Sequence, residues 1–219
     1  MQIKKLFLIL FSTLMILTLS ACKKSASSNG PADNTKQQLS IMKQTEKETL
    51  DGTERSGKNI LVVYFSWSGH LDSMAHWVAD ETGGNLYRVN AKVPYPDNFD
   101  QTADRAKREQ DKSERPEIVI DVTKEQMAQY DTVFIGFPVW WYDLPMPMWT
   151  FLESYDFSGK TIIPFFSHEG SSNGARALPT IERLALGATV RRTDALSIRG
   201  GNVDKSEKDV RTWIQGLGI

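Results

Sequence analysis

The stretch NILVVYFSWSGHL, residues 59–71, decides the fold of this chain. Residues 60–65 form an unbroken apolar run rich in β-branched side chains, which is typical of a strand buried on both faces of a parallel sheet. The polar loop Ser66–His70 then leads directly into residues with helical spacing. A buried strand, a short polar loop and a helix form the first half of a β-α-β unit.

The same alternation continues along the rest of the chain. Apolar runs at 132–137 and 161–166 predict two further buried strands, and 86–89 and the interrupted segment 188–198 predict two more. Apolar residues at helical spacing follow the strands, and Ser206 and Asp209 have the spacing of a capping pair at the start of the last helix. Five strands alternating with helices in about 160 residues predict an α/β fold, a doubly wound parallel sheet of order 2-1-3-4-5 with helices on both faces.

Composition excludes several classes of protein. The 219 residues are 40% hydrophobic and 24% charged, as expected for one globular domain with a tail. A formal net charge of -1 leaves no excess of basic residues to bind phosphates, so we expect no nucleic-acid partner. One cysteine and three histidines exclude a disulfide framework and a multi-cysteine metal site, and we expect no metal.

The N-terminal segment has the layout of a secretory signal. Lys4 and Lys5 precede a mostly apolar stretch, residues 6–19, which is too short for a comfortable membrane span. The segment ends at Leu19-Ser20-Ala21-Cys22, which resembles the lipobox of bacterial lipoproteins. We therefore expect a signal peptide at 1–21 and lipidation of Cys22; the alternative is a plain signal peptide with a chance cysteine. The lipobox implies export and lipid attachment to the bacterial cell membrane, with the domain facing outside the cytoplasm.

Residues 22–57 are expected to form a flexible linker. They are rich in polar and charged residues and contain few large apolar side chains, so they cannot bury enough surface to fold alone. The folded domain is then expected at 58–219, attached to the membrane surface at a distance from it.

The loop after the first strand has the composition of an anion site. Ser66, Ser68, Gly69 and His70 stand where a helix begins, and backbone N–H groups and hydroxyls there favour a negative charge. The loop has no Gly-Lys-Ser/Thr and no G-x-G-x-x-G, so it is neither a Walker loop nor the usual dinucleotide turn. A compact loop without lysine suits one terminal monophosphate. The alternative is that a serine simply caps the helix.

Two further loops at strand ends carry candidate ligand contacts. Pro138, Val139, Trp140 and Trp141 lead into Tyr142, and so many aromatic residues in a loop favour stacking on a planar ligand, unless they are core. Adjacent residues of an extended chain point in opposite directions, so we expect only Trp140 to stack and Trp141 to pack against the domain or the insertion. The polar segment 167–174 could hydrogen-bond the rim of a heterocycle; the alternative is a surface turn.

Together these loops resemble the flavodoxin family, in particular a diverged branch with bacterial surface members. The matching pieces are residues 64–70, 130–141 and 167–174, with a further match from Tyr95 to Ala106. The resemblance implies a flavodoxin-like fold and FMN as cofactor. It assigns the phosphate to Ser66, Ser68, Gly69, His70 and the N–H of Leu71, one side of the ring to Pro138, Val139, Trp140 and Trp141, and its other edge to His168, Glu169 and Gly170.

The chain departs from the family pattern in three places. Trp67 and His70 stand in the phosphate loop where small polar residues are commoner, and the third loop lacks the stacking aromatic of many short-chain flavodoxins. Residues 91–129 exceed the length that a simple crossover needs, which predicts an insertion. A charged helix is expected within 97–110, near the pocket, with Tyr95 at its edge.

These observations favour an FMN-binding lipoprotein that takes part in electron transfer or flavin-dependent redox chemistry. If it is an enzyme, the near-neutral charge favours two-electron exchange with a quinone, NAD(P)H or a small organic substrate. The alternative is a non-catalytic surface binding lipoprotein that retains the fold without flavin. A serine hydrolase is a more distant alternative. Residues 170–174 spell G-x-S-x-G, but Ser172 lies well past the strand end, and all three histidines precede it.

Overall fold

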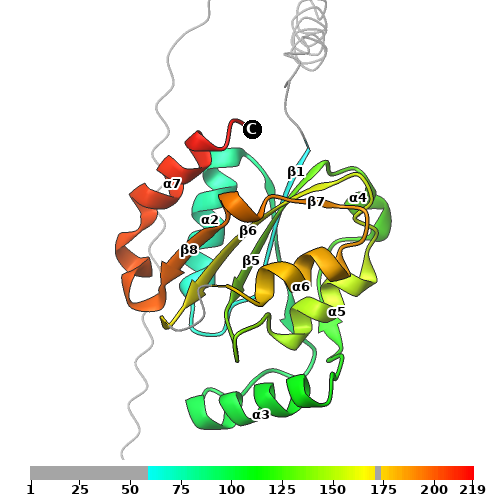
Figure 1. Ribbon diagram of the computed structural model, residues 1–219, viewed down its shortest axis with the longest axis vertical. Helices are drawn as coiled ribbons and strands as arrows, with labels where there is room; N and C mark the ends of the chain where they lie inside the picture. The colour runs from blue at the N-terminus through cyan, green and yellow to red at the C-terminus, as the bar shows by residue number, and fades with distance from the viewer. Residues whose placement is uncertain (1–58, 171–173) are drawn as a thin grey trace, which may run out of the picture. The chain divides into compact units, whose positions relative to one another are not determined.

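The computed structural model describes residues 59–170 and 174–219 (Figure 1). The expected signal peptide at 1–21, Cys22, the linker at 22–57 and residues 171–173 lie outside the described residues. Within the described ranges, no helix combines the length and the apolar composition needed to cross a bilayer.

A parallel sheet forms the centre of the domain. Its order is β2-β1-β5-β6-β7, and β8 pairs with β6 beyond β7, so that the two short strands together occupy the fifth position. This confirms the predicted order 2-1-3-4-5 and the interruption of the last strand. The strands are β1 (Ile60–Tyr64), β2 (Asn85–Arg88), β5 (Thr132–Pro138), β6 (Thr161–His168), β7 (Thr189–Val190) and β8 (Leu196–Arg199).

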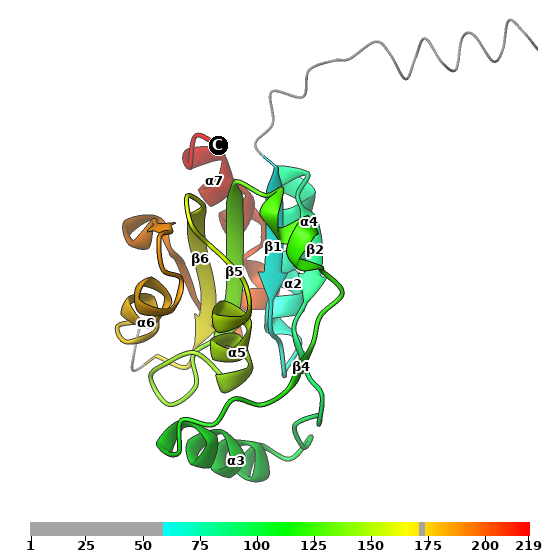
Figure 2. The ribbon, with the colours of Figure 1, turned by 90° about the vertical axis from the view of Figure 1, so that its right-hand side faces the viewer.

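The helices cover both faces of this sheet (Figure 2). One face packs against α2 and α7, and the other against α4, α5 and α6. The bounds are α2 (His70–Thr82), α4 (Lys124–Ala128), α5 (Met146–Ser154), α6 (Ala177–Leu184) and α7 (Glu207–Gly216), with 3₁₀ turns η1 (Arg192–Asp194) and η2 (Gly200–Lys205) around β8.

The central strands are continuous apolar runs because both of their faces are buried. In β1, Val62 packs in the cluster on the α2 side and Val63 in the cluster on the α5 side, and both have 0% exposure. In the neighbouring strand β5, Phe134 pairs in register with Val62 of β1 on one side and with Ile163 of β6 on the other. Burial of each such side chain stabilises the fold by roughly 1.5–3 kcal/mol.

One helix stands apart from the layers. Helix α3 (Phe99–Asp111) lies beyond the carboxyl ends of the strands (Figures 1 and 2), within the expected insertion. Asn98 caps it, because its side chain accepts a hydrogen bond from the Gln101 N–H at 3.0 Å. A short antiparallel pair, β3 (Asn90–Ala91) and β4 (Ile118–Val119), joins the two ends of this segment.

The expected cap of α7 is wrong. Ser206 precedes the helix, but its side chain makes no capping bond. Instead, the Ser206 hydroxyl donates to the Val203 carbonyl at 2.8 Å. The reason is the 3₁₀ turn η2, which brings that carbonyl next to the hydroxyl.

Candidate functional site

A cavity of about 430 Å³ lies at the carboxyl ends of β1, β5 and β6, next to α3. Pockets that bind small molecules measure roughly 300–1,000 Å³ and are mostly apolar with a few polar groups. The described lining fits that pattern: Trp67, Ser68, His70, Phe99, Thr102, Ala103, Ala106, Pro138, Val139, Trp140, Trp141, Ser167, His168 and Glu169.

The loop after β1 forms one end of the cavity. Gly69, at φ 95° and ψ -17°, precedes α2, and its carbonyl accepts from the N–H groups of Asp72 and Ser73. The N–H groups of His70 and Leu71 have no acceptor among the described residues. Free donors at the positive end of a helix dipole favour an anion at this point.

Further bonds fix the shape of this loop. The Ser66 hydroxyl is buried and accepts from the Gly69 N–H at 3.2 Å. Arg88 donates to the Ser66 carbonyl and to Asp72, both at 2.8 Å. Tyr64 donates to Asp72 at 2.9 Å, and burial together with this bond raises the pKa of Tyr64 to about 12. The loop is therefore held in place without a ligand.

The loop after β5 begins with a tight two-residue turn. Trp140 and Asp143 exchange both backbone hydrogen bonds at 2.9 Å, with Trp141 and Tyr142 between them at φ 46° and 72°. This left-handed conformation costs roughly 1–2 kcal/mol for each residue that is not glycine. Buried Asp143 holds the turn: its Oδ1 accepts from the Leu144 N–H at 2.8 Å and its Oδ2 from the Thr180 hydroxyl at 3.0 Å.

Trp141 contacts the insertion as predicted, but Trp140 does so as well through Tyr95, and both tryptophans line the cavity. Trp140 is half-buried, edge-on to Phe65 at 5.4 Å and to Tyr95 at 5.0 Å. Trp141 is 42% exposed, and its Nε1–H donates to the Ala103 carbonyl of α3 at 3.0 Å. The positive φ of Trp141 breaks the extended geometry on which the prediction depended. Which indole stacks on a ligand stays a prediction.

The end of β6 closes the cavity from the other side. His168 lines it, and His168 Nδ1 is buried without a hydrogen-bond partner among the described residues. A buried polar group without a hydrogen bond destabilises a fold by roughly 1–3 kcal/mol. A bound ligand that bonds His168 Nδ1 would remove this cost. Glu169 also lines the cavity.

Gly200, at the start of η2, makes this arrangement possible. A Cβ there would lie 2.4 Å from Glu169 Oε1 and 3.0 Å from the His70 ring. A larger residue at position 200 would therefore require the Glu169 carboxylate and the His70 ring to shift.

The predicted residues thus fall into two groups. The structure brings together around the cavity Ser68, His70, Pro138, Val139, Trp140, Trp141, His168 and Glu169. Four others do not line it: Ser66, Gly69, Leu71 and Gly170. Ser66 and Gly69 shape the first loop, while the Leu71 side chain is core at 1% exposure and only its N–H is available. The ligand contacts of all twelve residues stay predictions.

Comparison with known proteins settles the family. The family model for flavodoxin matches residues 59–216. The chain belongs to the flavodoxin family. A solved protein from Bacteroides uniformis, described as a flavoprotein, is 31% identical, with a TM-score of 0.61, over 73% of this chain and 99% of that one.

Two further solved flavodoxin-like structures are similar. One, from Bacteroides eggerthii and also described as a flavoprotein, is 27% identical, with a TM-score of 0.59, over 74% of this chain and 99% of that one. The other is a flavoprotein from Lactobacillus acidophilus in complex with FMN, which is 26% identical, with a TM-score of 0.54, over 68% of this chain and 98% of that one. No curated protein matches.

In this flavodoxin-family domain, α3 is the charged helix that was expected near the pocket, and it supplies lining residues that the sequence analysis did not name. Thr102, Ala103 and Ala106 line the cavity, and Phe99 lies at its edge, 6.4 Å from the Trp67 ring. Trp67 is itself tied to the insertion, because its Nε1–H donates to the Pro96 carbonyl at 2.9 Å. The signal in the sequence was the spacing of the small residues, which puts them on one face of an otherwise charged helix.

A buried ion pair within α3 binds Tyr95, whose ring packs against Phe65 and Trp140 of the domain. Glu109 is 3% exposed and accepts from Arg105 Nε at 2.7 Å and from the Tyr95 hydroxyl. The Arg105 guanidinium lies 3.9 Å from the Tyr95 ring centre and also donates to the Pro94 carbonyl at 2.8 Å. Burial, and then Glu109, raise the pKa of Tyr95 well above its usual value. The phenol therefore stays a neutral donor, with its ring against Trp140.

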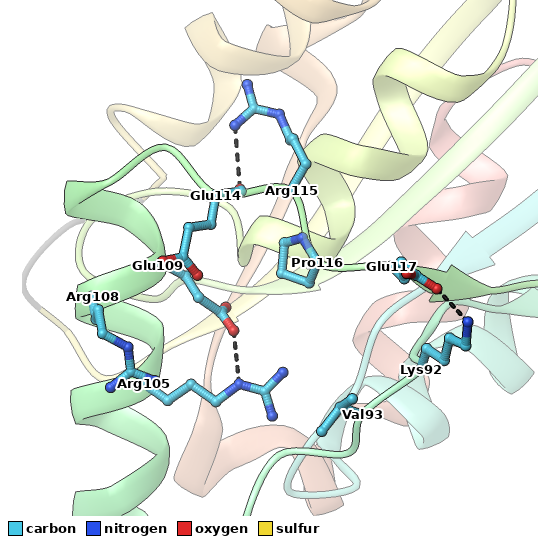
Figure 3. Close-up of a pocket in the computed structure, with 9 residues that line it drawn as sticks. All are labelled: Lys92, Val93, Arg105, Arg108, Glu109, Glu114, Arg115, Pro116 and Glu117. Carbon is cyan, nitrogen blue, oxygen red and sulfur yellow. Dashed lines mark hydrogen bonds and ion pairs between the residues drawn. The ribbon is translucent and has the colours of Figure 1, made fainter.

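A larger cavity, of about 660 Å³, lies on another side of α3 (Figure 3). It contains none of the predicted site residues, and most of its charges are already paired. Arg105 bonds Glu109, Lys92 bonds Glu117, and Arg115 bonds both the Glu114 carbonyl and Glu153. Among the described residues, no group of three or more His, Cys, Asp or Glu side chains could hold a metal ion.

Proposed function

We propose that this flavodoxin-family protein binds one FMN and takes part in electron transfer or flavin-dependent redox chemistry. One observation carries the proposal. The same cavity offers unpaired N–H donors at the start of α2, aromatic walls, and the unpaired His168 Nδ1 at the end of β6. FMN presents a phosphate, a planar ring and polar ring edges. The Lactobacillus acidophilus relative in complex with FMN supports this choice.

The residues present fit the phosphate end of FMN. The N–H groups of His70 and Leu71 and the hydroxyl of Ser68 would donate to phosphate oxygens, aided by the α2 dipole. Glycine suits position 69 because a residue with a side chain would be strained at φ +95°. Space is not the constraint, since a Cβ there would find no atom within 4 Å. The loop offers no evident place for an adenylate, which favours FMN over FAD.

The residues that line the cavity also fit the flavin ring. Pro138, Val139 and one or both indoles would flank it, and His168 with Glu169 would meet its edge. Bound flavin supplies electron or hydride transfer; the protein tunes access and potential. Helix α3 would cover that side of the ring through Thr102, Ala103 and Ala106. Glu169 is the only acidic side chain in the described lining of the cavity, and such a weakly acidic surround favours two-electron exchange with a quinone, NAD(P)H or a small organic substrate.

The test of the cofactor is the visible spectrum of the protein purified from its native membrane. We expect flavin absorbance and release of FMN at one mole per mole of chain on denaturation. Protein that lacks flavin and does not take up added FMN would instead be the non-catalytic binding protein. Release of FAD would contradict the argument from the compact first loop.

We also propose that the chain is exported and held to the bacterial cell membrane through lipidated Cys22, with residues 1–21 removed. The support is the sequence alone: a basic start, an apolar stretch and Leu19-Ser20-Ala21-Cys22. One acyl chain binds membranes only marginally, whereas two or more make attachment stable.

Replacing the lipidated residue tests this location. We expect Cys22→Ala to move the protein from the membrane fraction to the soluble fraction or to block its processing, while Ser20→Ala, which keeps the thiol, stays in the membrane fraction. The measurement is membrane fractionation with mass spectrometry of the N-terminal peptide. A Cys22→Ala protein of mature length that still sediments with membranes would exclude the lipid attachment.

A further inference from the structure

A second cavity, of about 420 Å³, adjoins the proposed flavin cavity but is lined by different residues. It lies among the end of α3, α5 and α6. The two cavities share the turn at Trp140–Asp143: Asp143 lines the second one, and Gln110, also in its lining, donates from Nε2 to the Trp141 carbonyl at 3.4 Å. The second cavity is therefore a neighbour of the first, with its own chemistry.

Its hydrogen-bond donors are largely unused. Trp149 lines the cavity, and its Nε1 is buried with no hydrogen-bond partner in the described part of the chain. Arg176 and Arg183 also line it, and neither has a carboxylate within 4.0 Å among the described residues. Three donor groups, two of them cationic and solvent-exposed, thus line a cavity in which none of them has a protein acceptor among the described residues.

The nearby carboxylates already accept hydrogen bonds from other groups. Both oxygens of Asp143 accept bonds, from the Leu144 N–H and the Thr180 hydroxyl. Glu153 is bound by Arg115 through both oxygens, and Arg183 is near enough to contribute to lowering the Glu153 pKa without bonding it. Arg183 is therefore partly neutralised, but its own hydrogen bonds remain free.

The cavity also has an apolar component. Met146 and Pro179 are in its lining, and two guanidinium groups lie over the Trp149 ring, that of Arg115 at 4.8 Å and that of Arg183 at 4.7 Å from the ring centre. This stacking holds Arg183 at the cavity, so that little side-chain freedom is lost when it binds a ligand. An inorganic anion would leave this apolar surface unused.

From these features we infer that the second cavity is a binding site for a small organic carboxylate with an apolar body. The carboxylate oxygens accept from Arg183, Arg176 and Trp149 Nε1–H, and the apolar body packs against Met146 and Pro179. The assignment does not depend on the flavin, because no donor of this cavity lines the first one.

Indole NMR signals give a direct test. The chain has six tryptophans, and Trp149→Phe identifies the Trp149 signal in ¹⁵N-labelled full-length protein loaded with FMN in detergent. Benzoate is the probe, and neutral benzamide is its isosteric control. We expect a saturable shift of the Trp149 Nε1–H signal with benzoate and none with benzamide.

Variants locate the carboxylate. We expect Arg183→Gln and Arg176→Gln each to weaken benzoate binding about tenfold, since each removes a charge-assisted bond. Lys208→Gln, on exposed α7, is the matched charge control and leaves the affinity unchanged. Retention of the other five indole signals shows that each variant is folded.

The inference is overturned if benzoate gives no saturable shift, if benzamide or inorganic phosphate binds as tightly, or if neither arginine variant weakens binding. Repeating the titration without FMN separates this outcome from a failure of the flavin proposal.

Discussion

Gly69→Glu is expected to abolish FMN binding while the domain stays folded. The substitution puts a carboxylate where the proposed phosphate accepts from the start of α2, and like charges at a contact cost several kcal/mol. It also forces a side chain onto a backbone at φ 95°. The combined loss of FMN affinity is on the order of a hundredfold or more. The measurement is an FMN titration by fluorescence quenching, alongside circular dichroism.

Two variants separate charge from strain in this experiment. Gly69→Ala carries only the strain of the left-handed backbone, so it is expected to lose much less affinity. Gly159→Glu places the same charge on another glycine of positive φ, 75°, which also has no atom within 4 Å of a Cβ but lies at the opposite ends of the strands. It should bind FMN like the unchanged protein. Normal FMN affinity in Gly69→Glu would refute the phosphate assignment.

Glu109→Ala is expected to give the largest loss of stability. It leaves Arg105, whose side chain is 17% exposed, without its carboxylate partner, and leaves the buried Tyr95 hydroxyl without its acceptor. Removing one partner of a buried ion pair costs about 3–5 kcal/mol. Unfolding should occur roughly 6–20 °C lower in a thermal melt followed by circular dichroism.

The same helix supplies the control. Asp111 forms an ion pair with Lys107 at the same i,i+4 spacing, but the two side chains are 57% and 42% exposed. Exposed pairs of this kind contribute about 0.3–0.5 kcal/mol, so Asp111→Ala should barely change the melt. Equal melting temperatures for the two variants would show that the Glu109 cluster does not hold α3 to the domain.

The sheet was predictable because the sequences of its central strands fit only one kind of structure, a strand buried on both faces. A run such as 60–65 has no polar face, so it can only be buried on both sides, and its length excludes a typical helix. The carboxyl ends of parallel strands share one edge, and for that reason the loops at 66–70, 138–141 and 168–169 were expected to meet, and they do.

The missed parts of the site come from tertiary contacts. The spacing of Thr102, Ala103 and Ala106 puts them on one face of the charged helix α3, but it does not show that this face lines a cavity rather than packing on the core. Gly200 lies far along the chain from the residues that need its small size, so its role depends on the pairing of β8 with β6. The direction of Trp141 was also hidden, because a positive φ is rare for tryptophan and the turn that imposes it is held by buried Asp143.

The pairing of β8 with β6 bears on the order in which the cavity takes shape during synthesis. Every described residue that lines the cavity lies between Trp67 and Glu169, whereas β8, which pairs with β6 from Phe165 to His168, is made later. The contact between β8 and β6 can form only after the intervening chain has been made, and it carries the entropy cost of closing a long loop. A nascent chain that stops short of β8 therefore has all of these lining residues but lacks the strand that fixes the end of β6 at His168.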